Sequence, residues 1–292
     1  KLISTEMPIG INYNAGISAQ LKSAVILAGL NSYGTTKILE EKESRNHTEN
    51  MLIKNPQVIK LKKSKKKLIE IFGKKYLKPI NIRVPGDPSS AAFFAALTIL
   101  NKNSNLKIKN VGLNQTRIGF YELLKKHGAK IKFKNIKKNS NEIHGDIYVK
   151  SCEVNPIKAS KEYYVKATDE YPILFVIAAL TNGISTFKGI EDLANKESNR
   201  IKEMAKILKQ IGIKTIVSKN QMKIFGKKNI DTKNKIIKVA DLGDHRICQS
   251  ATILSLVTGV TTYLKGFETV NTSAPSFLKI IKSLGGKFEI KK

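Results

Sequence analysis

Four segments of the chain share one pattern of polar and apolar positions. Each begins with a polar residue, continues into an apolar stretch of helical length, turns at Gly or Asn, and ends in a β-branched strand. The segments are residues 18–38, 89–108, 169–187 and 244–264. They start roughly 70 to 80 residues apart, which is longer than the period of a solenoid repeat. The spacing predicts four copies of one folding unit.

A second helix is predicted after each of the last three segments. In the third copy, residues 201–208 place apolar side chains at i, i+3, i+4 and i+7, which is one face of a helix. A glycine after each of these helices supplies the left-handed conformation at which many helices end. The alternating residues 213–217, which follow Gly212, predict a half-buried strand. Each copy is therefore predicted to run strand, helix, strand, helix, strands.

The first helices differ from the second ones because they lack a polar face. Residues 91–97 and 173–180 are wholly apolar, so we expect them inside a bundle. Units whose first helices meet at the centre, with sheets outside, satisfy this requirement. A doubly wound sheet of four βα pairs is the alternative, but it predicts amphipathic helices. We therefore expect the four first helices to be more buried than the second ones, and a domain junction near residues 83–87.

The chain carries 52 basic and 23 acidic residues, a formal net charge of +29. Such a balance raises the question of nucleic-acid or membrane binding. The lysines, however, are spread along the whole chain, and only residues 62–67 and 132–138 form dense runs. A single aromatic residue, Phe133, lies within them, which is too few for stacking on nucleic-acid bases. The excess of Lys, together with many Ile and Asn, is typical of a protein from an AT-rich genome.

Arginine is rare among these basic residues. The arginines are Arg45, Arg83, Arg117, Arg200 and Arg246. Where Lys is the default cation, these positions are candidates for the planar, two-bonded contacts that Lys cannot make.

No segment predicts membrane insertion or export. The longest apolar stretch, residues 171–180, has about half the length of a membrane crossing, and residues 1–9 lack the pattern of a signal peptide. The chain has no initiator Met, so we expect that it begins inside a longer protein. Cys152 and Cys248 form neither a disulfide framework nor a metal-ligand spacing. These features favour a cytoplasmic protein with reduced thiols.

Polar residues cluster where the predicted helices begin, and helix N-termini attract anions through free N–H groups and a positive dipole end. Ser18-Ala19-Gln20 opens the first helix, either as an ordinary cap or as a seat for phosphate. Arg45 lies in the motif Ser-Arg-Asn-His-Thr-Glu at residues 44–49, which is either a helix cap or an anion contact.

Two further clusters combine carboxylates with cations. Asp169 and Glu170 precede a wholly apolar helix, either as a cap or as a general base whose pKa burial adjusts. Lys196 and Arg200 are spaced i, i+4 on one predicted helical face, and Glu197 lies at i, i+3 from Arg200. This second cluster is either a solvated salt-bridge ladder or part of a site.

The cluster Asp244-His245-Arg246 precedes the apolar residues 247–257, and a helix cap explains only the aspartate. Together the clusters offer carboxylates for proton transfer and cations for anionic groups. The sequence contains no metal triad and no Ser–His–Asp set. Residues 86–90 are not a P-loop, because no Gly-Lys-Ser/Thr follows. We therefore expect neither a metal nor a cofactor.

At these clusters the sequence resembles the 5-enolpyruvylshikimate-3-phosphate synthase family over essentially its whole length. The matching stretches are residues 18–24, 28–30, 45–49, 84–93, 169–174, 196–201, 243–247 and 272–277. So many motifs in the order of one family are not expected by chance.

The resemblance implies the α/β fold of the enolpyruvyl transferases, a two-domain inside-out α/β barrel of repeated βαβαββ units. Each domain of the family holds three units, and the active site lies in the cleft between the domains. Residues 1–83 correspond to the last repeat of the first globular domain, and residues 84–292 to the second globular domain of three repeats. Roughly two units would be absent, so we expect this chain alone to hold an incomplete site and to be inactive.

The resemblance also implies an activity. The family transfers the carboxyvinyl group of phosphoenolpyruvate to the 5-hydroxyl of shikimate 3-phosphate and releases phosphate, in the shikimate pathway to chorismate and the aromatic amino acids. The reaction is an addition followed by an elimination, through a tetrahedral intermediate. We expect a monomer that acts on these two small anions without nucleic acid, membrane or cofactor.

The roles of family residues transfer to the matching positions. Asp169 and Glu197 are the implied catalytic residues: Asp169 is the base for the 5-hydroxyl, and Glu197 exchanges a proton with the methylene carbon of phosphoenolpyruvate. The implied ligands of shikimate 3-phosphate are Ser18, Ala19, Gln20, Arg45, Asp169 and Lys196. The implied ligands of phosphoenolpyruvate are Gln20, Arg200 and Arg246.

Three positions depart from the family pattern. Asn199 stands where Asp is usual, and Ala274 stands where Phe is usual. A lysine that some members carry near Thr272 is absent. We expect the first two departures to alter packing, and the third to remove one phosphoenolpyruvate contact.

Two other functions remain open at this point. The UDP-N-acetylglucosamine enolpyruvyl transferases share the fold and the donor, but residues 169–172, 196–198 and 244–246 favour the shikimate enzyme. A basic nucleic-acid-binding protein is the alternative from another class, and it predicts binding to random DNA that weakens steeply with salt.

Overall fold

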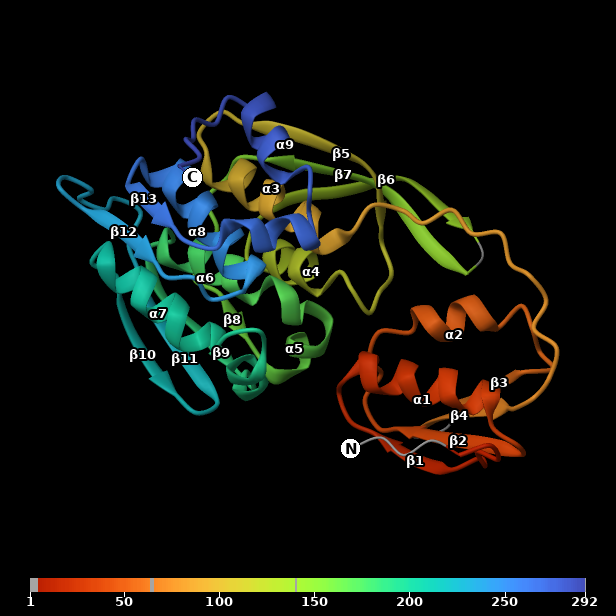
Figure 1. Ribbon diagram of the computed structural model, residues 1–292. Coiled ribbons are helices and arrows are strands. Elements are labelled where there is room, and N and C mark those ends of the chain that lie inside the picture. The colour runs from red at the N-terminus through yellow and green to blue at the C-terminus, as the bar shows by residue number, and fades with distance from the viewer. Residues whose placement is uncertain (1–4, 64–65, 140, 292) are drawn as a thin grey trace. The chain divides into compact units, whose positions relative to one another are not determined.

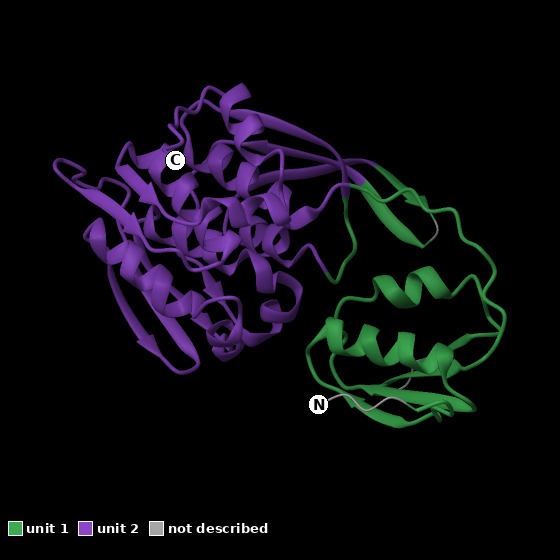
Figure 2. Cartoon of the chain, viewed as in Figure 1, with its two compact units in different colours: residues 1–85, 112–116, 136–144 green, residues 86–111, 117–135, 145–292 purple. Residues whose placement is uncertain are grey.

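The computed structural model describes residues 5–63, 66–139 and 141–291, and its contacts group into two units (Figure 2). Unit 1 comprises Lys1–Pro85, Gly112–Thr116 and Ile136–His144. Unit 2 comprises Gly86–Val111, Arg117–Asn135 and Gly145–Lys292. The first boundary lies between Pro85 and Gly86, and two later segments return to unit 1.

Unit 1 contains one complete strand–helix–strand–helix–strand–strand repeat. Its elements are β1 (Asn12–Ala15), α1 (Ala19–Asn31), β2 (Thr35–Glu40), α2 (His47–Leu52), β3 (Ile59–Lys63) and β4 (Lys67–Phe72). The strands form one sheet in the order β1-β2-β4-β3. The pair β1–β2 is parallel, because helix α1 returns the chain in the direction of β1, and the pairs β2–β4 and β3–β4 are antiparallel.

One face of this sheet forms the apolar core beneath α1. Ile38 of β2 and Ile71 of β4 are fully buried on it, and Ile26 of α1 packs against them. Gly29 permits this close approach, because a Cβ at that position would come within 3.0 Å of the Thr36 side chain. Each buried isoleucine contributes about 1.5–3 kcal/mol relative to an exposed one.

Unit 2 contains the other three copies. The second copy consists of α3 (Pro88–Leu100), β5 (Asn105–Gly112), α4 (Gly119–Lys126), β6 (Lys130–Asn139) and β7 (Glu142–Lys150). The third consists of β8 (Lys158–Ala159), α5 (Lys161–Ala167), η1 (Thr168–Glu170), α6 (Tyr171–Ala179), β9 (Gly183–Lys188), η2 (Glu191–Asn195), α7 (Arg200–Gln210), β10 (Lys214–Ser218) and β11 (Gln221–Gly226). The fourth consists of β12 (Ile236–Val239), α8 (His245–Thr258), β13 (Thr261–Leu264), η3 (Phe267–Thr272) and α9 (Phe277–Ser283). Parts of β5, β6 and β7 extend into the segments that group with unit 1.

The sheets of the copies follow one topology. The order β8-β9-β11-β10 repeats the order β1-β2-β4-β3 of unit 1. In the second copy, a parallel bridge between Gly86 and Val111 stands where a first strand would lie beside β5 in the sheet β5-β7-β6. The fourth copy has the parallel pair β12–β13. The four copies predicted from the sequence are therefore confirmed as versions of one unit, except that the described residues of the fourth copy contain no strand after α9.

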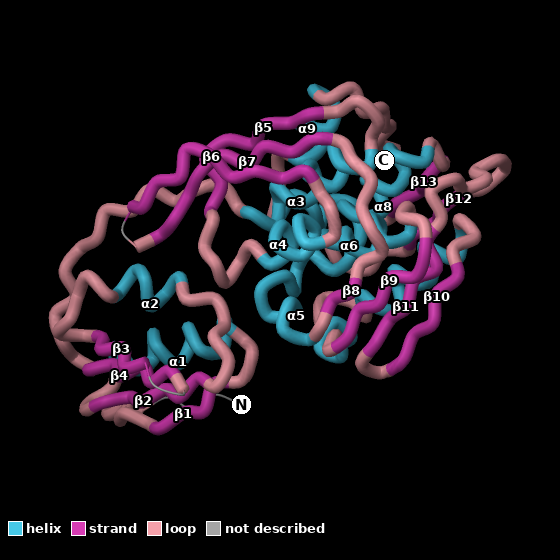
Figure 3. Tube along the Cα trace, turned by 180° about the vertical axis from the view of Figure 1, so that it is seen from behind, coloured by secondary structure: helices cyan, strands magenta, loops and turns pink. Residues whose placement is uncertain are grey.

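The first helices of the last three copies meet at the centre of unit 2, with the sheets outside (Figures 1 and 3). Eleven of the thirteen residues of α3, all nine of α6 and eight of the fourteen of α8 are buried. In the second helices, five of eight residues of α4, five of eleven of α7 and two of seven of α9 are buried. The prediction that the first helices are more buried than the second is confirmed within each of these three copies, although the buried share of α8 is smaller than that of α4.

For the first copy the same prediction is wrong. Only three of the thirteen residues of α1 are buried, a smaller share than the two of six in α2. Leu21 and Leu27 are 58 % and 52 % exposed. The reason is that the described residues of unit 1 form a single copy, so α1 packs on a sheet on one side and meets no first helix of another copy among them.

The last helix of the chain packs on the first helix of unit 2. The ring of Phe277 in α9 lies 6.3 Å from that of Phe93 and 5.5 Å from that of Phe94, measured between ring centres. Both partners belong to α3, so the fourth copy closes against the second. No helix in the described part of the chain is long and apolar enough to cross a membrane.

Candidate active site

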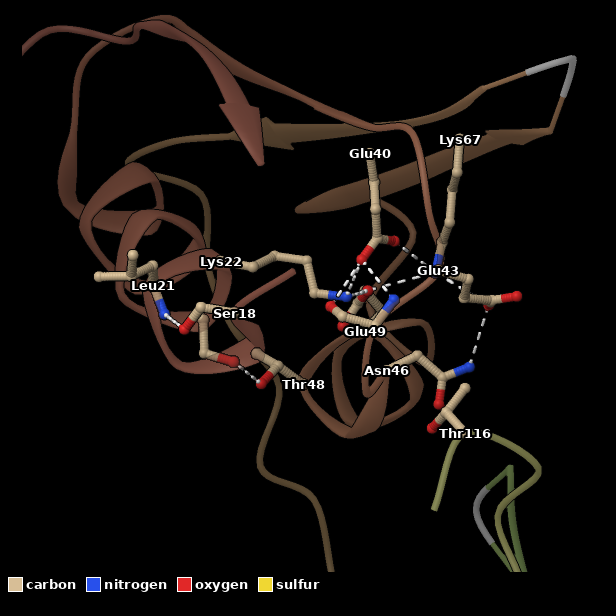
Figure 4. Close-up of polar contacts among 12 residues, drawn as sticks. Ser18, Leu21, Lys22, Glu40, Glu43, Asn46, Thr48, Glu49, Lys67 and Thr116 are labelled. Carbon is tan, nitrogen blue, oxygen red and sulfur yellow. Dashed lines mark hydrogen bonds and ion pairs between the residues drawn. The ribbon is translucent and has the colours of Figure 1, made fainter. Parts of the chain in front are cut away.

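In unit 1, helix α1 begins with the predicted Ser18-Ala19-Gln20 turn. Ser18 is the N-cap, and its Oγ accepts a hydrogen bond from the Leu21 N–H at 3.3 Å (Figure 4). No acidic residue lies in the first turn, and the Gln20 side chain is exposed. This turn therefore combines an ordinary cap with the local polarity that an anion requires.

Arg45 lies in the loop between β2 and α2, directly after a firmly held residue. Ser44 is buried, and its N–H and Oγ both donate to Glu40 Oε1, at 2.8 and 2.6 Å. Arg45 itself is half-buried, and α2 starts two residues later at His47. A buried carboxylate thus fixes the backbone next to the predicted anion contact.

In unit 2, a buried ion pair joins the starts of α7 and α8. Arg200 is 1 % exposed, and Asp244, the N-cap of α8, is fully buried. The Arg200 guanidinium donates from Nε to Asp244 Oδ2 at 2.9 Å and from Nη2 to Oδ1 at 3.3 Å. Burial works to raise the pKa of Asp244, but the hydrogen bond and charge of Arg200 outweigh it and lower that pKa. The pair uses the two-bonded geometry that a lysine cannot supply.

Arg200 also contacts the two carboxylates predicted to move protons. Its Nη2 lies 2.5 Å from Glu197 Oε2, and its Nη1 lies 3.7 Å from Asp169 Oδ1. The side chains of Asp169 and Glu197 are 22 % and 47 % exposed, so both can meet a ligand. Arg200 thus orients protein carboxylates, and Nη1 is its only nitrogen without a hydrogen-bond partner among the described residues.

Arg246 has a different environment. It is 7 % exposed, and its buried Nε and Nη1 have no hydrogen-bond partner within the described parts of the chain. Its guanidinium carbon lies 5.9 Å from the centre of the Phe93 ring, a contact that uses none of its donors. Burial, followed by the charge of Arg246, lowers the pKa of His245, so that imidazole is neutral at pH 7. A buried guanidinium with unused donors is suited to a carboxylate or phosphate ligand.

Lys196 lies outside helix α7, so the prediction that it shares a helical face with Arg200 is wrong. The helix begins at Arg200 because Asn199 is its N-cap and accepts a main-chain N–H bond at 3.0 Å. Lys196 instead pairs through Nζ with Asp192 Oδ2 at 2.7 Å. The Tyr164 hydroxyl donates to the same Asp192 oxygen at 2.8 Å. Sequence reasoning missed Asp192, although its i, i+4 spacing to Lys196 was a signal.

The start of α3 holds a further polar cluster that sequence reasoning missed. Arg117 Nη2 donates to Asp87 Oδ1 at 2.7 Å and to Ser89 Oγ at 2.6 Å. Asp87, rather than Ser89, caps the helix, and its carboxylate accepts a main-chain N–H bond at 2.8 Å. The rarity of Arg marked Arg117 as a candidate, and the structure gives it these protein partners.

Glu170 is the second carboxylate of the Asp169–Glu170 pair. It is 2 % exposed, and its Oε1 has no hydrogen-bond partner among the described residues. Burial, and then the charge of Asp169, raises the pKa of Glu170. Asp169 and Glu170 lie in η1, ahead of α6, and neither side chain caps that helix. In the described part of the chain, no group of three or more His, Cys, Asp or Glu side chains could hold a metal ion.

Comparison with known protein families identifies the relatives of this chain. Residues 6–281 match the family described as EPSP synthase (3-phosphoshikimate 1-carboxyvinyltransferase). The chain belongs to the EPSP synthase family. The 3-phosphoshikimate 1-carboxyvinyltransferase of Zymomonas mobilis is 36 % identical over 286 residues, which cover 97 % of this chain and 63 % of the relative. That of Persephonella marina is 38 % identical over 273 residues, which cover 93 % of this chain and 62 % of the relative.

Solved structures agree with this membership in the EPSP synthase family. An EPSP synthase from Acinetobacter baumannii matches with a TM-score of 0.83 at 33 % identity, over 98 % of this chain and 65 % of that one. The enolpyruvyl transferase NikO from Streptomyces tendae matches with a TM-score of 0.72 at 12 % identity, over 97 % of this chain and 66 % of that one, which is a likeness of fold alone. The predicted fold class is confirmed. The chain spans about 63 % of the length of the curated relatives it matches.

Within this EPSP synthase family chain, the structure explains one of the three departures and gives the surroundings of the other two. Asn199 caps α7, a position for which Asn and Asp are about equally suited. Ala274 is half-buried, and its N–H donates to the Val270 carbonyl at 2.8 Å. Thr272 is exposed, and its hydroxyl donates to the Thr269 carbonyl at 2.7 Å.

The raised pKa of Glu170 predicts a stabilising substitution in this EPSP synthase family member. Ionising Glu170 is harder in the folded than in the unfolded chain, so the free energy of unfolding falls as the pH rises above the unfolded pKa of about 4.3. Glu170→Gln should therefore be more stable than wild type at pH 8, by about 1–3 kcal/mol, and equal to it near pH 4. Thermal unfolding between pH 4 and 8 measures the difference.

Asp87→Asn is the control, because the opposite change in stability is expected for it. Burial works to raise the pKa of Asp87, but the charge of Arg117 and the bond from the Ser90 N–H outweigh it, and the pKa is lowered. Asp87→Asn should therefore lose stability at pH 8, and the loss should shrink as the pH falls toward the folded pKa. A Glu170→Gln variant that loses stability at pH 8 as Asp87→Asn does would show that Glu170 is ionised in the folded protein.

Proposed function

We propose that this chain forms part of an enzyme that transfers the carboxyvinyl group of phosphoenolpyruvate to the 5-hydroxyl of shikimate 3-phosphate. The observation that carries the proposal is the cluster in unit 2, where Arg200 contacts Asp169 and Glu197 and Arg246 keeps unused donors. Membership in the EPSP synthase family supports the reaction class, and curated relatives carry the name 3-phosphoshikimate 1-carboxyvinyltransferase.

The proposed reaction begins with addition. Glu197 gives a proton to the methylene carbon of phosphoenolpyruvate, and the 5-hydroxyl oxygen attacks the adjacent carbon while Asp169 takes the hydroxyl proton. In the elimination, Glu197 takes a proton back from the new methyl group and the carbon–oxygen bond to phosphate breaks. The double bond forms again, and phosphate leaves with the proton that Asp169 held. Each proton step needs a positioned acid or base.

The cations of the cluster stabilise the charges of this reaction. Arg246 binds the carboxylate or the phosphate of phosphoenolpyruvate with its unused donors, and Arg200 uses its remaining Nη1 for the same ligand. Lys196, held by Asp192, faces shikimate 3-phosphate beside Asp169. These assignments explain why arginine persists at two positions in a lysine-rich chain.

Residues of unit 1 complete the binding of shikimate 3-phosphate. Ser18, Ala19 and Gln20 seat its phosphate at the start of α1, where N–H groups and the helix dipole favour an anion, and Gln20 also contacts phosphoenolpyruvate. Arg45 supplies a second cation for the same phosphate. The proposed enzyme is a cytoplasmic monomer that uses two small anions and neither nucleic acid nor membrane, and its positive charge suits such substrates.

Phosphate release tests the proposal. The full-length protein should release inorganic phosphate from phosphoenolpyruvate only when shikimate 3-phosphate is present, with one enol ether formed for each phosphate. UDP-N-acetylglucosamine in place of shikimate 3-phosphate should give no release. Phosphate release with UDP-N-acetylglucosamine but not with shikimate 3-phosphate would assign the chain to the other enolpyruvyl transferases. No release with either acceptor would refute the proposed function.

A further inference from the structure

Four charged side chains form a nearly solvent-free cluster in unit 1 (Figure 4). Lys22 Nζ lies 2.8 Å from Oε1 of both Glu40 and Glu49. Lys67 Nζ lies 3.2 Å from Glu49 Oε1 and 3.6 Å from Glu40 Oε2. The side chains of Lys22 and Glu40 are 0 % exposed, that of Glu49 1 %, and that of Lys67 9 %. Two cations therefore balance two buried carboxylates, and Lys67 Nζ also lies 3.3 Å from Oε1 of the more exposed Glu43.

Stability alone does not explain this cluster. Removing charges from water costs about as much as their attraction returns, and apolar residues of similar volume are often equally stable. Glu40 Oε2 and Glu49 Oε2 also have no hydrogen-bond partner among the described atoms, so their desolvation is only partly compensated. Burial works to raise the pKa of Glu40, but bonds from Lys22 and Ser44 outweigh it and lower that pKa. The cluster is better explained by what it holds in place.

A chain of contacts runs through Lys22 from the start of α1 to the Arg45 loop. The Lys22 N–H donates to the Ser18 carbonyl at 3.2 Å, one helical turn before it. Its ammonium group reaches Glu40, the last residue of β2, and the same Glu40 oxygen accepts both bonds from Ser44. Ser44 directly precedes Arg45. Lys22 thus connects the two segments that the proposed function assigns to one phosphate.

A second set of contacts fixes α2 to α1. Glu49 lies in α2, and its carboxylate forms the second ion pair of the Lys22 ammonium group. Beside it, Ser23 Oγ and Thr48 Oγ1 share a hydrogen bond at 2.7 Å. The bonds of Ser44 to Glu40 therefore fix the loop on the N-terminal side of Arg45. The contacts of α2 with α1 fix it on the C-terminal side.

We propose that Lys22 is a positioning residue for shikimate 3-phosphate. It holds the turn of residues 18–20 and the Arg45 loop in one geometry, and it does not touch the ligand because its side chain is fully buried. The inference rests on the proposed function, which assigns the substrate phosphate to these two segments. A phosphate held by several donors at once loses affinity when those donors no longer converge.

Substitution of Lys22 in the full-length protein tests this role. Lys22→Met should raise KM for shikimate 3-phosphate on the order of 10-fold, the effect of one weakened charge-assisted hydrogen bond, and leave kcat and KM for phosphoenolpyruvate within about twofold. The variant should also melt at a lower temperature, because two buried carboxylates then face one cation. Lys66→Met is the control, since Lys66 pairs with Glu41 at the surface of the same unit, where the two side chains are 49 % and 58 % exposed, and it should change none of these quantities.

A charge-balanced variant separates positioning from stability. Lys22→Met/Glu49→Gln removes one charge of each sign and should regain the melting temperature. Its KM for shikimate 3-phosphate should stay raised, because Glu40 and Ser44 remain disconnected from α1. A KM that recovers together with the melting temperature, or an equal rise in KM for both substrates, would overturn the proposal. A wild-type protein that does not use shikimate 3-phosphate would instead refute the proposed function, so the two failures are distinct.

Discussion

Glu197→Gln in the full-length protein is expected to lower kcat by about 10²- to 10⁴-fold, the contribution of one positioned acid or base. Glutamine keeps the size of the side chain but can neither give nor take the proton of the methylene carbon. The fold should survive, because Glu197 is 47 % exposed and Arg200 keeps both bonds to Asp244. Steady-state kinetics and the melting temperature of one preparation measure the two effects separately.

Deuterium identifies the step that Glu197→Gln affects. In D₂O the wild-type protein should place deuterium on the methylene carbon of the product, because that carbon gains one proton and loses another. The matched control is Glu203→Gln, since Glu203 pairs with Lys206 at i, i+3, as Glu197 pairs with Arg200. Near-normal turnover with full deuterium incorporation in Glu197→Gln would assign this proton transfer to another group.

Arg246→Lys should lower kcat/KM for phosphoenolpyruvate about 10- to 150-fold and leave the melting temperature unchanged. The loss equals one charge-assisted bond of about 1.5–3 kcal/mol, because Lys keeps the charge but cannot form two parallel bonds. The fold should tolerate the change, since Arg246 Nε and Nη1 form no hydrogen bond to the described residues. Kinetics with each substrate varied in turn should show a much smaller effect for shikimate 3-phosphate.

Arg200→Lys and Arg83→Lys are the comparison variants for Arg246→Lys. Arg200→Lys should lower kcat/KM for phosphoenolpyruvate and also the melting temperature, because Arg200 makes two bonds to the buried Asp244. Arg83 is exposed, so Arg83→Lys should change neither. An Arg246→Lys variant with unchanged phosphoenolpyruvate kinetics and a large loss for shikimate 3-phosphate would reverse the assignment of this arginine.

The central helices of unit 2 could be predicted from sequence because a helix without a polar face is stable only when neighbours cover it on all sides. The sequences of α3 and α6 meet that condition, and both are buried. The same reasoning failed for α1, because the burial of a helix also depends on how many neighbours its own unit supplies. That number is a tertiary property, and the local pattern does not contain it.

The site was predictable as clusters of residue types but not as contacts. Arg200 could be singled out by its rarity, yet its pairing with Asp244 connects positions 44 residues apart in the chain. Lys196 was misplaced because Asn199 competes for the start of α7 and caps it. Lys22 could not be singled out from the sequence, because a single lysine in an apolar helix is indistinguishable from a surface residue until its two carboxylate partners are located.

The packing of Phe277 on Phe93 and Phe94 has a consequence for biosynthesis. Helix α3 leaves the ribosome before α9, and the α9 ring that packs on it is made roughly 180 residues later, which at 5–20 residues per second is about 10 to 40 s. During that interval the nascent chain exposes an apolar helix that cannot yet be covered by its native partner. Unit 2 should therefore engage chaperones during translation and close only after its C-terminal helix has emerged.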